Sequence, residues 1–175
     1  MTTVHPDDLT TPTLDPKTLR RAFGAYPSGV VAVAAQVGDR KVGIAASSFT
    51  SVSLEPALVS FSIANTSSTW PELRDAGHLG LSVLADHHGE VCRQLAGPAD
   101  NRFDGLEVRV TDEGAVLLAD AVATFDCTIH REVEAGDHTI ALLQLHAVEG
   151  PGALSPLVFH RSMFGRLHHE LARAG

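Results

Sequence analysis

Short apolar or alternating segments, separated by turn residues, make up most of the chain. They predict β-strands, because short runs rich in β-branched and aromatic side chains suit a pleated, partly buried surface. The segments of this kind are 29–37, 42–46, 57–64, 78–85, 106–110, 115–118, 121–132, 139–149 and 157–160. No regular alternation with long helices is present, which favours an antiparallel barrel with helical insertions over a parallel α/β sheet.

Residues 1–14 are polar and rich in Thr, Pro and Asp, and we expect them to form a flexible arm. Asp15 then offers an N-cap, the proline after it suits the first helical position, and Gly24 lies near the end, so a helix is predicted over 16–23. No repeat, low-complexity tract or second-domain boundary follows. We therefore expect residues 15–175 to form a single domain.

Two further short helices are predicted from their end signals. A polar loop leads into a helix that Ser68 or Thr69 can cap and that Gly77 ends. Asp86 offers the cap of a third helix, which runs through Leu95 and is closed by the Gly-Pro dipeptide beyond it. The residues alone thus predict a mainly β fold with a few short helices.

The charge balance argues against a general nucleic-acid-binding or membrane-binding surface. The 175 residues include 13 Lys and Arg against 21 Asp and Glu, a formal net charge of −8. No apolar run approaches the roughly 20 residues of a membrane span, and the polar start is not a secretory signal. Cys92 and Cys127 form no CxxC pair, so we expect buried free thiols in a reducing cytoplasm.

The ten histidines raise the question of a metal site. Four of them form the adjacent pairs 87–88 and 168–169, whose side chains would point in different directions on a helix. No HExxH motif is present. We therefore expect no metal ligands among them.

The sequence changes character after the strand predicted at 42–46. Five of the seven residues from Ser47 to Ser53 carry hydroxyl groups, and the other two, Phe49 and Val52, are strand formers. This composition suits a half-buried strand end with many neutral donors and acceptors, able to hold a flat polar heterocycle without burying a charge. An ordinary hydroxyl-rich edge strand explains the same composition.

Three other places offer candidate chemistry. The loop 65–69 runs into a helix start, where unpaired N–H groups and the helix dipole favour a phosphate, although an ordinary capped helix has the same sequence. Arg93 lies on the next predicted helix and can bind a phosphate or belong to a solvated face. Gly136, Asp137 and His138 form a good hairpin turn, which needs no further role.

Four stretches, in the same order along the chain, resemble the flavin reductase-like family. They are Tyr-Pro-Ser-Gly-Val at 26–30, Ser-Phe-Thr-Ser-Val-Ser-Leu-Glu-Pro at 48–56, Ser-Ser-Thr-Trp-Pro at 67–71 and Gly-Asp-His-Thr-Ile at 136–140. The similarity covers roughly residues 19–167. It implies a mainly β (α+β) fold, an antiparallel Greek-key split β-barrel with short helices of the FMN-binding type.

The resemblance also implies an activity. Members are NAD(P)H:flavin oxidoreductases that transfer a hydride from NADH or NADPH to FMN or FAD, and many supply reduced flavin by diffusion to a partner flavin-dependent monooxygenase. A homodimer is implied as well. The absence of GxGxxG and GxSxG motifs agrees with this reading. A non-enzymatic flavin-binding redox carrier or sensor is the alternative, and a split-barrel oxidase acting on a small substrate ranks behind both.

The resemblance assigns roles to individual residues. His138 is the catalytic candidate, as a group that stacks on the nicotinamide and orients it. Arg161 and Phe164 are expected to line the nicotinamide side, and Arg93 to pair with a phosphate. This chain has Ser47 where the family commonly has Asn. The expected cofactor-binding residues are Ser47, Ser48, Phe49, Thr50, Ser51, Ser53, Ser62, Asn65, Ser67, Ser68, Thr69, Arg93, Phe103, Gly136, Asp137, His138, Arg161 and Phe164.

Overall fold

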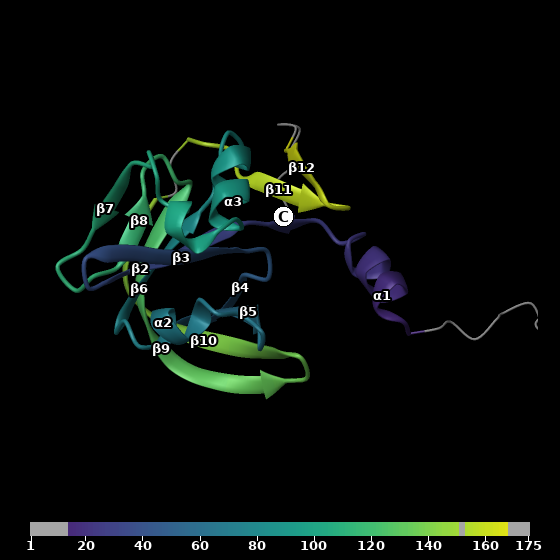
Figure 1. The fold of residues 1–175 in the computed structure, drawn as a ribbon, viewed down its shortest axis with the longest axis horizontal. Coiled ribbons are helices and arrows are strands. Elements are labelled where there is room, and N and C mark those ends of the chain that lie inside the picture. The colour runs from purple at the N-terminus through teal and green to yellow at the C-terminus, as the bar shows by residue number, and fades with distance from the viewer. Residues whose placement is uncertain (1–13, 151–152, 168–175) are drawn as a thin grey trace, which may run out of the picture.

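The computed structural model describes residues 14–150 and 153–167, and about half of them belong to strands (Figure 1). The helices are α1 (Pro16–Phe23), α2 (Trp70–Arg74) and α3 (Gly89–Leu95), with a short 3₁₀ helix at Ala99–Asn101. The strands are β1 (Ser28–Gly29), β2 (Val31–Val37), β3 (Arg40–Ala46), β4 (Thr50–Leu54), β5 (Ala57–Ala64), β6 (His78–Val83), β7 (Val108–Val110), β8 (Val116–Leu118), β9 (Ala123–Ala135), β10 (His138–Glu149), β11 (Leu157–His160) and β12 (Met163–Arg166).

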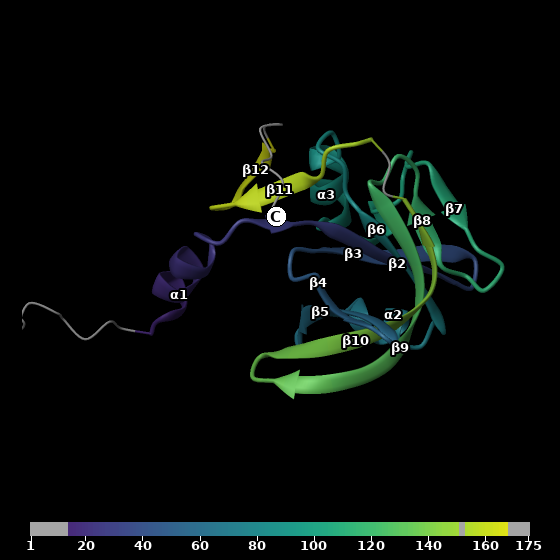
Figure 2. The same ribbon diagram turned by 180° about the vertical axis from the view of Figure 1, so that it is seen from behind.

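One seven-stranded sheet forms the body of the molecule. Its strand order is β3-β2-β6-β9-β10-β5-β4, and every neighbouring pair is antiparallel. The sheet curves into an incomplete barrel (Figures 1 and 2). Its two edge strands, β3 and β4, follow each other in the chain, but no ladder of hydrogen bonds joins them. The barrel is therefore split where residues 47–49 cross from one edge to the other.

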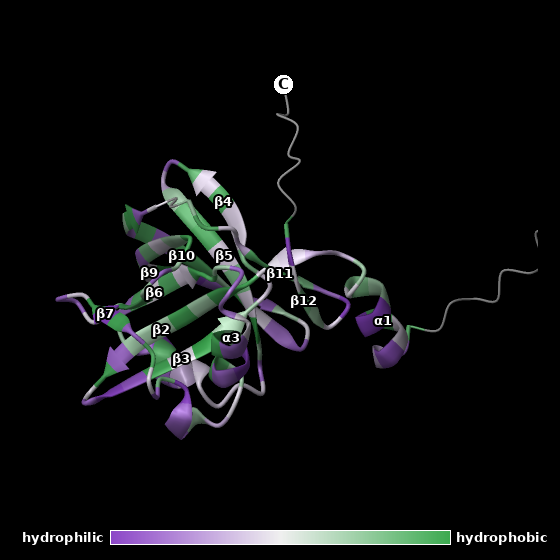
Figure 3. Ribbon diagram, turned by 90° about the horizontal axis from the view of Figure 1, so that it is seen from above, coloured by the Kyte–Doolittle hydropathy of each residue, from purple (hydrophilic) through white to green (hydrophobic). Residues whose placement is uncertain are grey.

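The interior of the barrel is filled by alternating residues of its strands. In β5, Val59, Phe61 and Ile63 are buried, whereas Ser60 and Ser62 on the other face are half-buried. Figure 3 shows how apolar residues concentrate along β2 and β5. Burial of each large apolar side chain contributes about 1.5–3 kcal/mol, so this alternation fixes which face of β5 points inward.

A second apolar cluster lies beneath α3. Cys92 and Leu95 of that helix pack with Leu84, Leu118 and Leu157. Leu157 begins β11, which pairs with β1 and β12 in a small separate sheet. This cluster holds α3 and the β11–β12 hairpin against the outside of the barrel, beside the end of β3.

Several predicted elements are confirmed. The first helix spans Pro16–Phe23, and the Asp15 carboxylate accepts hydrogen bonds from the N–H groups of Lys17 and Thr18 at 3.0 and 3.1 Å. The strands predicted at 57–64 and 157–160 are found with those bounds. The mainly β, antiparallel architecture is confirmed as well. The predicted arm lies outside the described residues, apart from residue 14.

One predicted cap is confirmed in position only, and another is wrong. Thr69 is the N-cap residue of α2, but its side chain makes no capping hydrogen bond, and the N–H of Trp70 donates to Ser67 Oγ at 3.2 Å. The third helix begins at Gly89 and not at Asp86. The reason is that His88 Nδ1 accepts a hydrogen bond from the N–H of Ala85 at 3.1 Å, which closes a turn before the helix.

Three strands were not predicted as separate elements. The segment predicted at 29–37 is divided between β1, which pairs with β11 in the small sheet, and β2 in the large one. The hydroxyl-rich stretch contains its own strand, β4, where a continuation of the preceding strand was expected. The segment after residue 160 contains β12, where a tail was expected. In the turn between β11 and β12, Arg161 and Ser162 have positive φ angles of 50° and 62°, and such turns carry Gly or Asn more often.

α1 projects from the barrel and buries none of its residues (Figures 1 and 2). The N–H of Arg161 donates to the carbonyl oxygen of Gly24 at 2.9 Å, which joins the end of the helix to the β11–β12 turn. Both cysteines are free and buried, as expected, and burial raises the pKa of the Cys127 thiol. No helix in the described ranges is long and apolar enough to cross a membrane.

Candidate flavin site

Two adjoining hollows lie on either side of the end of β3. The first has a volume of about 370 Å³ and is lined by residues 44–48 and 62–64 together with Ser67 and His138. The second, of about 240 Å³, is mainly apolar and is lined by α3 and the β11–β12 hairpin. Residues 45–47 line both. Ala45, Ala46 and Ser47 thus form the common wall of both hollows. We call the first the polar hollow, because serines and His138 make up half of its lining residues, and the second the apolar hollow.

The backbone of this wall is available for a ligand. β3 is an edge strand that pairs only with β2, so one side of its N–H and C=O groups has no ladder partner. The side chains there are small, and the Ser47 side chain is exposed. Unpaired backbone groups beside alanine side chains suit the polar edge of a flat ring. The donor set present at this wall therefore fits a flavin.

Ser48 closes the split in the barrel beside this wall. Its hydroxyl accepts a hydrogen bond from the N–H of Ser62 at 2.9 Å and donates one to the carbonyl oxygen of Ser62 at 3.1 Å. In the β4–β5 ladder Thr50 lies opposite Ser60, so the same register would place Ser48 opposite Ser62. The Ser48 side chain thus takes the place of a backbone pair with β5, at the crossing between β3 and β4.

His138 enters the polar hollow from the β9–β10 hairpin, and Asn65 holds that hairpin in place. The Asn65 amide donates to the carbonyl oxygen of Gly136 at 3.2 Å and accepts from the Thr139 hydroxyl at 2.9 Å. Its N–H also donates to the carbonyl oxygen of Asp137 at 2.9 Å. Asn65 therefore fixes the hairpin on both sides of His138, and both polar atoms of its side chain take part.

The Asp137 carboxylate lies 2.7 Å from His138 Nδ1. This hydrogen bond, followed by the charge of His138, holds the pKa of Asp137 below its usual value, although the carboxyl group is solvent-exposed. The contact fixes one ring nitrogen of His138 and leaves the other directed elsewhere. An oriented imidazole on the rim of the polar hollow is the arrangement that a stacking role requires.

The predicted phosphate loop is divided between two roles. Ser67 lines the polar hollow, whereas Thr69 is buried and its hydroxyl accepts a hydrogen bond from Arg102 at 2.9 Å. The same guanidinium donates to the carbonyl oxygens of Gly43 at 2.8 Å and Gly97 at 2.9 Å. α2 has only five residues, so its dipole contributes little. Arg102 joins β3, α2 and the segment after α3.

Arg102 was not among the residues expected from the sequence. Two of its acceptors, on Gly43 and Thr69, lie 59 and 33 residues away. No local pattern signals such contacts, because a lone arginine in a loop is more often solvated.

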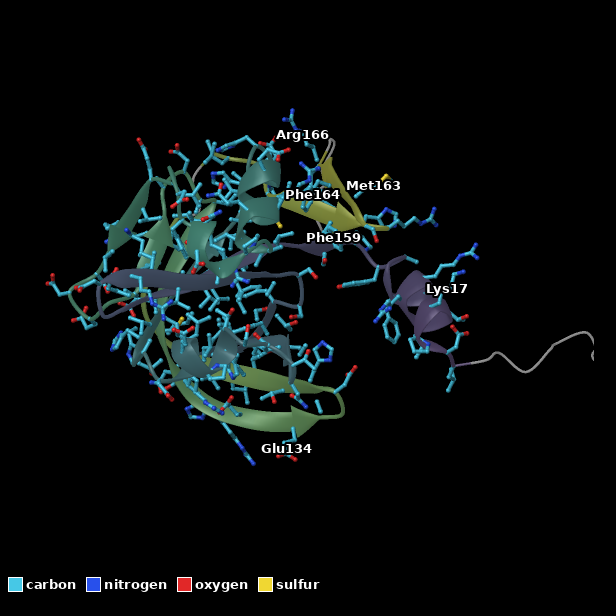
Figure 4. All side chains as sticks on the ribbon, in the orientation of Figure 1. Lys17, Glu134, Phe159, Met163, Phe164 and Arg166 are labelled. Carbon is cyan, nitrogen blue, oxygen red and sulfur yellow. The ribbon has the colours of Figure 1, made fainter. Side chains whose placement is uncertain are left out.

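The apolar hollow is bounded by Arg93 and Phe164. The guanidinium carbon of Arg93 lies 5.1 Å from the centroid of the Phe164 ring, a cation–π distance, and Arg93 also pairs with Glu90. Figure 4 shows Phe159 and Phe164 on the hairpin beside α3, with ring centroids 5.8 Å apart. The Cys92 thiol lines the same hollow, and burial raises its pKa.

The other expected residues lie outside these two hollows. Phe49 packs on the barrel core, where its ring stacks on Phe125 at 6.1 Å. Phe103 packs in the cluster beneath α3, against Gly43, where an added Cβ would come within 2.6 Å of the ring. Arg161 lines a separate hollow beside α1. The remaining members are Thr50, Ser51 and Ser53 on the edge strand β4, Ser68 in its loop, and Gly136 and Asp137 at the hairpin tip.

The chain matches a family model and several known proteins. The family model described as "Flavin reductase like domain" matches residues 23–168. The flavin reductase of Pseudomonas putida is 39% identical over 153 residues, which cover 87% of this chain and 90% of that protein. The reductase component of the flavin-dependent trigonelline monooxygenase of Acinetobacter baylyi is 40% identical over 125 residues, 71% of this chain but only 40% of that longer protein.

A solved structure resembles the whole fold. The NADH:FAD oxidoreductase SgcE6 of Streptomyces globisporus, in complex with NAD and FAD fragments, is 34% identical, with a TM-score of 0.84. The match covers 93% of this chain and 100% of that one. The predicted split-barrel fold is thereby confirmed.

Proposed function

The chain belongs to the family of flavin reductase like domains, and on this premise we propose that it is an NAD(P)H:flavin oxidoreductase. When bound together, the two cofactors supply the chemistry: a hydride passes from the reduced nicotinamide of NADH or NADPH to the isoalloxazine of FMN or FAD. The observation that carries the proposal is the pair of hollows that share residues 45–47, one polar and one apolar, with His138 on the polar rim.

The residues of the polar hollow provide what a flavin needs. The Ser47 hydroxyl and the free backbone side of β3 hydrogen-bond the polar edge of the ring. Ser62 and Ser67 add neutral hydroxyl groups on the opposite wall. Since none of these groups is charged, none has to be neutralised when the ring covers it. Arg93, whose only close carboxylate among the described residues is that of Glu90, is the cation available to the flavin phosphate.

His138 positions the nicotinamide and does not transfer a proton. Hydride transfer requires the two rings at about 3–3.5 Å with aligned orbitals, which is a proximity effect. Asn65 and Asp137 hold His138 on the rim of the hollow through backbone and side-chain hydrogen bonds. A rigidly held imidazole restricts the orientations open to a ring that stacks on it. Phe164 lines the adjoining apolar hollow and restricts the orientations of a ring that enters it.

Reduced flavin leaves by diffusion for a partner flavin-dependent monooxygenase. The support is the similarity to the reductase component of a trigonelline monooxygenase. The buried free thiols Cys92 and Cys127 suit the reducing cytoplasm in which such a pair would work. We also take residues 15–175 as one domain, which the family match over 23–168 supports.

The functional unit is a homodimer. The edge strand β4 exposes Leu54 almost fully and Val52 by about half. Phe23 at the end of α1 and Tyr26 just beyond it are each exposed by more than two thirds. Apolar side chains of this size on an open edge and on an undocked helix are the usual mark of a protein interface. Light scattering at micromolar concentration should give twice the chain mass. A monomer with full flavin affinity would contradict the proposal.

The activity is tested by mixing the protein with FMN or FAD and with NADH or NADPH. Loss of the reduced-nicotinamide absorbance, followed in all four combinations, identifies the preferred pair. A protein that binds flavin but oxidises neither nucleotide would be a carrier, and the reductase proposal would be wrong.

A further inference from the structure

Arg102 joins three elements that surround the two hollows. Of these, α3 and α2 lie on opposite sides of β3 (Figures 1 and 2). The guanidinium donates to the carbonyl oxygen of Gly43, on β3, at 2.8 Å and to the hydroxyl of Thr69, at the start of α2, at 2.9 Å. A third hydrogen bond, of 2.9 Å, runs to the carbonyl oxygen of Gly97, just after α3. One planar group thus fixes how far these elements lie from one another.

The loop that carries Arg102 is itself held against α3. The side-chain amide of Gln94, on that helix, donates to the carbonyl oxygen of Asn101 at 3.0 Å and to that of Asp104 at 2.8 Å. These two acceptors lie on either side of Arg102 in the sequence. The guanidinium therefore starts from a loop whose position relative to α3 is fixed.

The same loop fixes β3 at the point where the common wall of the hollows begins. Gly43 is buried and lies two residues before this wall, residues 45–47. Besides the hydrogen bond from Arg102, it is packed against the Phe103 ring, which would lie 2.6 Å from an added Cβ. Only glycine permits so close an approach. Arg102 and Phe103 therefore hold β3 through its carbonyl oxygen and through its Cα.

The geometry of Arg102 explains these contacts better than its charge does. All three acceptors are neutral, and Arg102 forms no ion pair with a carboxylate in the described ranges 14–150 and 153–167. It is not among the residues that line the polar or the apolar hollow. A guanidinium offers five N–H donors in a rigid plane, which the single ammonium of a lysine cannot reproduce. Arg102 thus acts through the elements that it holds.

We propose that Arg102 is a positioning residue that fixes the distance between the wall for the flavin ring and the helix for its phosphate. This inference rests on the proposed function. The ring lies against residues 45–47, whereas Arg93 on α3 is the cation available to the phosphate. A ligand that spans two contact points gains from the second one only when their separation matches its own length. Arg102 therefore makes the site select a flavin with a ribityl phosphate over the bare ring.

The test compares FMN with lumiflavin, which has the same ring without the ribityl phosphate. Both are titrated by fluorescence into the full-length, flavin-free protein. Arg102→Lys keeps the charge but loses the planar set of donors, so it separates geometry from electrostatics. It should weaken FMN about three- to tenfold and lumiflavin by less than about twofold, because only FMN reaches α3. Urea unfolding of each variant measures the accompanying loss of stability.

Gln94→Ala is a milder variant of the same connection. It releases the loop from α3 but leaves every hydrogen bond of Arg102 available. It should lower the ratio of FMN affinity to lumiflavin affinity in the same direction, by about two- to fivefold. If Arg102→Lys does not fold, Gln94→Ala decides the question, and an unchanged ratio in it overturns the proposal.

Arg40→Gln is the matched control. Arg40 also joins β3 to α2, through an ion pair with Glu72, but it lies at the opposite end of β3 from the common wall and is exposed. Its loss should leave the affinity ratio within twofold. A ratio that falls equally in Arg40→Gln, or that stays unchanged in Arg102→Lys, would overturn the proposal. A loss of stability without a change in this ratio would make Arg102 a purely structural residue.

The titrations involve no turnover, so their outcome is separate from that of the activity assay. A wild type that prefers FMN to lumiflavin, loses this preference in Arg102→Lys and oxidises no NAD(P)H would contradict the proposed function but support the role of Arg102. A protein that oxidises NAD(P)H with an unchanged preference in Arg102→Lys would do the reverse.

Discussion

Replacing Ser48 by Ala tests whether one side chain holds the split barrel closed. The Ser48 hydroxyl makes two hydrogen bonds, both with the backbone of Ser62, at 2.9 and 3.1 Å. The variant leaves the N–H and C=O of Ser62 without these partners on a half-buried strand. The common wall of the two hollows, residues 45–47, is the segment that this contact anchors.

The size of the effect follows from these contacts. A neutral hydrogen bond contributes about 0.5–1.5 kcal/mol net, and Ser48 is exposed, so water replaces part of what is lost. We expect Ser48→Ala to lower the free energy of unfolding by about 1–2 kcal/mol, or the melting temperature by about 2–8 °C for a chain of this size. Flavin affinity should fall as well, because the wall that binds the ring is no longer fixed.

Urea unfolding and a flavin fluorescence titration measure the two effects. Ser51→Ala is the control, since Ser51 is an exposed hydroxyl residue of the same stretch whose side chain makes no hydrogen bond within the described chain. The control should change stability by less than about 0.5 kcal/mol. If Ser48→Ala is no more destabilising than Ser51→Ala, the reasoning on the split barrel is refuted.

Three other variants test the site and its surroundings. His138→Ala should raise KM for NAD(P)H and slow flavin reduction in stopped flow at nearly constant flavin affinity, by less than the about 10²–10⁴-fold of an obligatory proton donor. Reduction at the wild-type rate would favour the carrier reading. Arg161→Gly removes a residue at φ 50° and should stabilise the fold by about 1 kcal/mol in urea unfolding. Because the pKa of Asp137 is lowered in the folded protein, its carboxylate stabilises the fold above its usual pKa and ceases to do so as pH falls through the lowered value. The stability difference between wild type and Asp137→Asn should therefore vanish at acid pH.

Elements with local end signals could be predicted from the sequence with their bounds. α1 is an example, because Asp15, the following proline and Gly24 all lie within one residue of its ends. β5 is another, since alternation alone determines its inward face. In both cases the deciding interactions are between residues close in sequence or with the core as a whole, and neither requires knowledge of a specific distant partner.

The roles of the hydroxyl residues could not be predicted in this way. Ser47, Ser48 and Thr50 have similar side chains and lie close together in the sequence. Ser47 nevertheless lines both hollows, Ser48 is hydrogen-bonded to Ser62 of β5, and Thr50 lies on the exposed edge strand β4. What separates them is the crossing between β3 and β4, which depends on the register with Ser60 and Ser62. Composition indicates a polar site, but only the register assigns each hydroxyl a partner.

The same limit explains the wrong start of α3. Asp is a residue type that often caps helices, but at Asp86 the chain forms a turn instead, because His88 Nδ1 accepts a hydrogen bond from the N–H of Ala85. Burial lowers the pKa of His88, so its imidazole stays neutral and keeps an acceptor nitrogen for that bond. The helix begins only after this turn. The preference of Asp for N-cap positions is thus outweighed by a contact of the His88 side chain, and the burial of His88 depends on the whole fold.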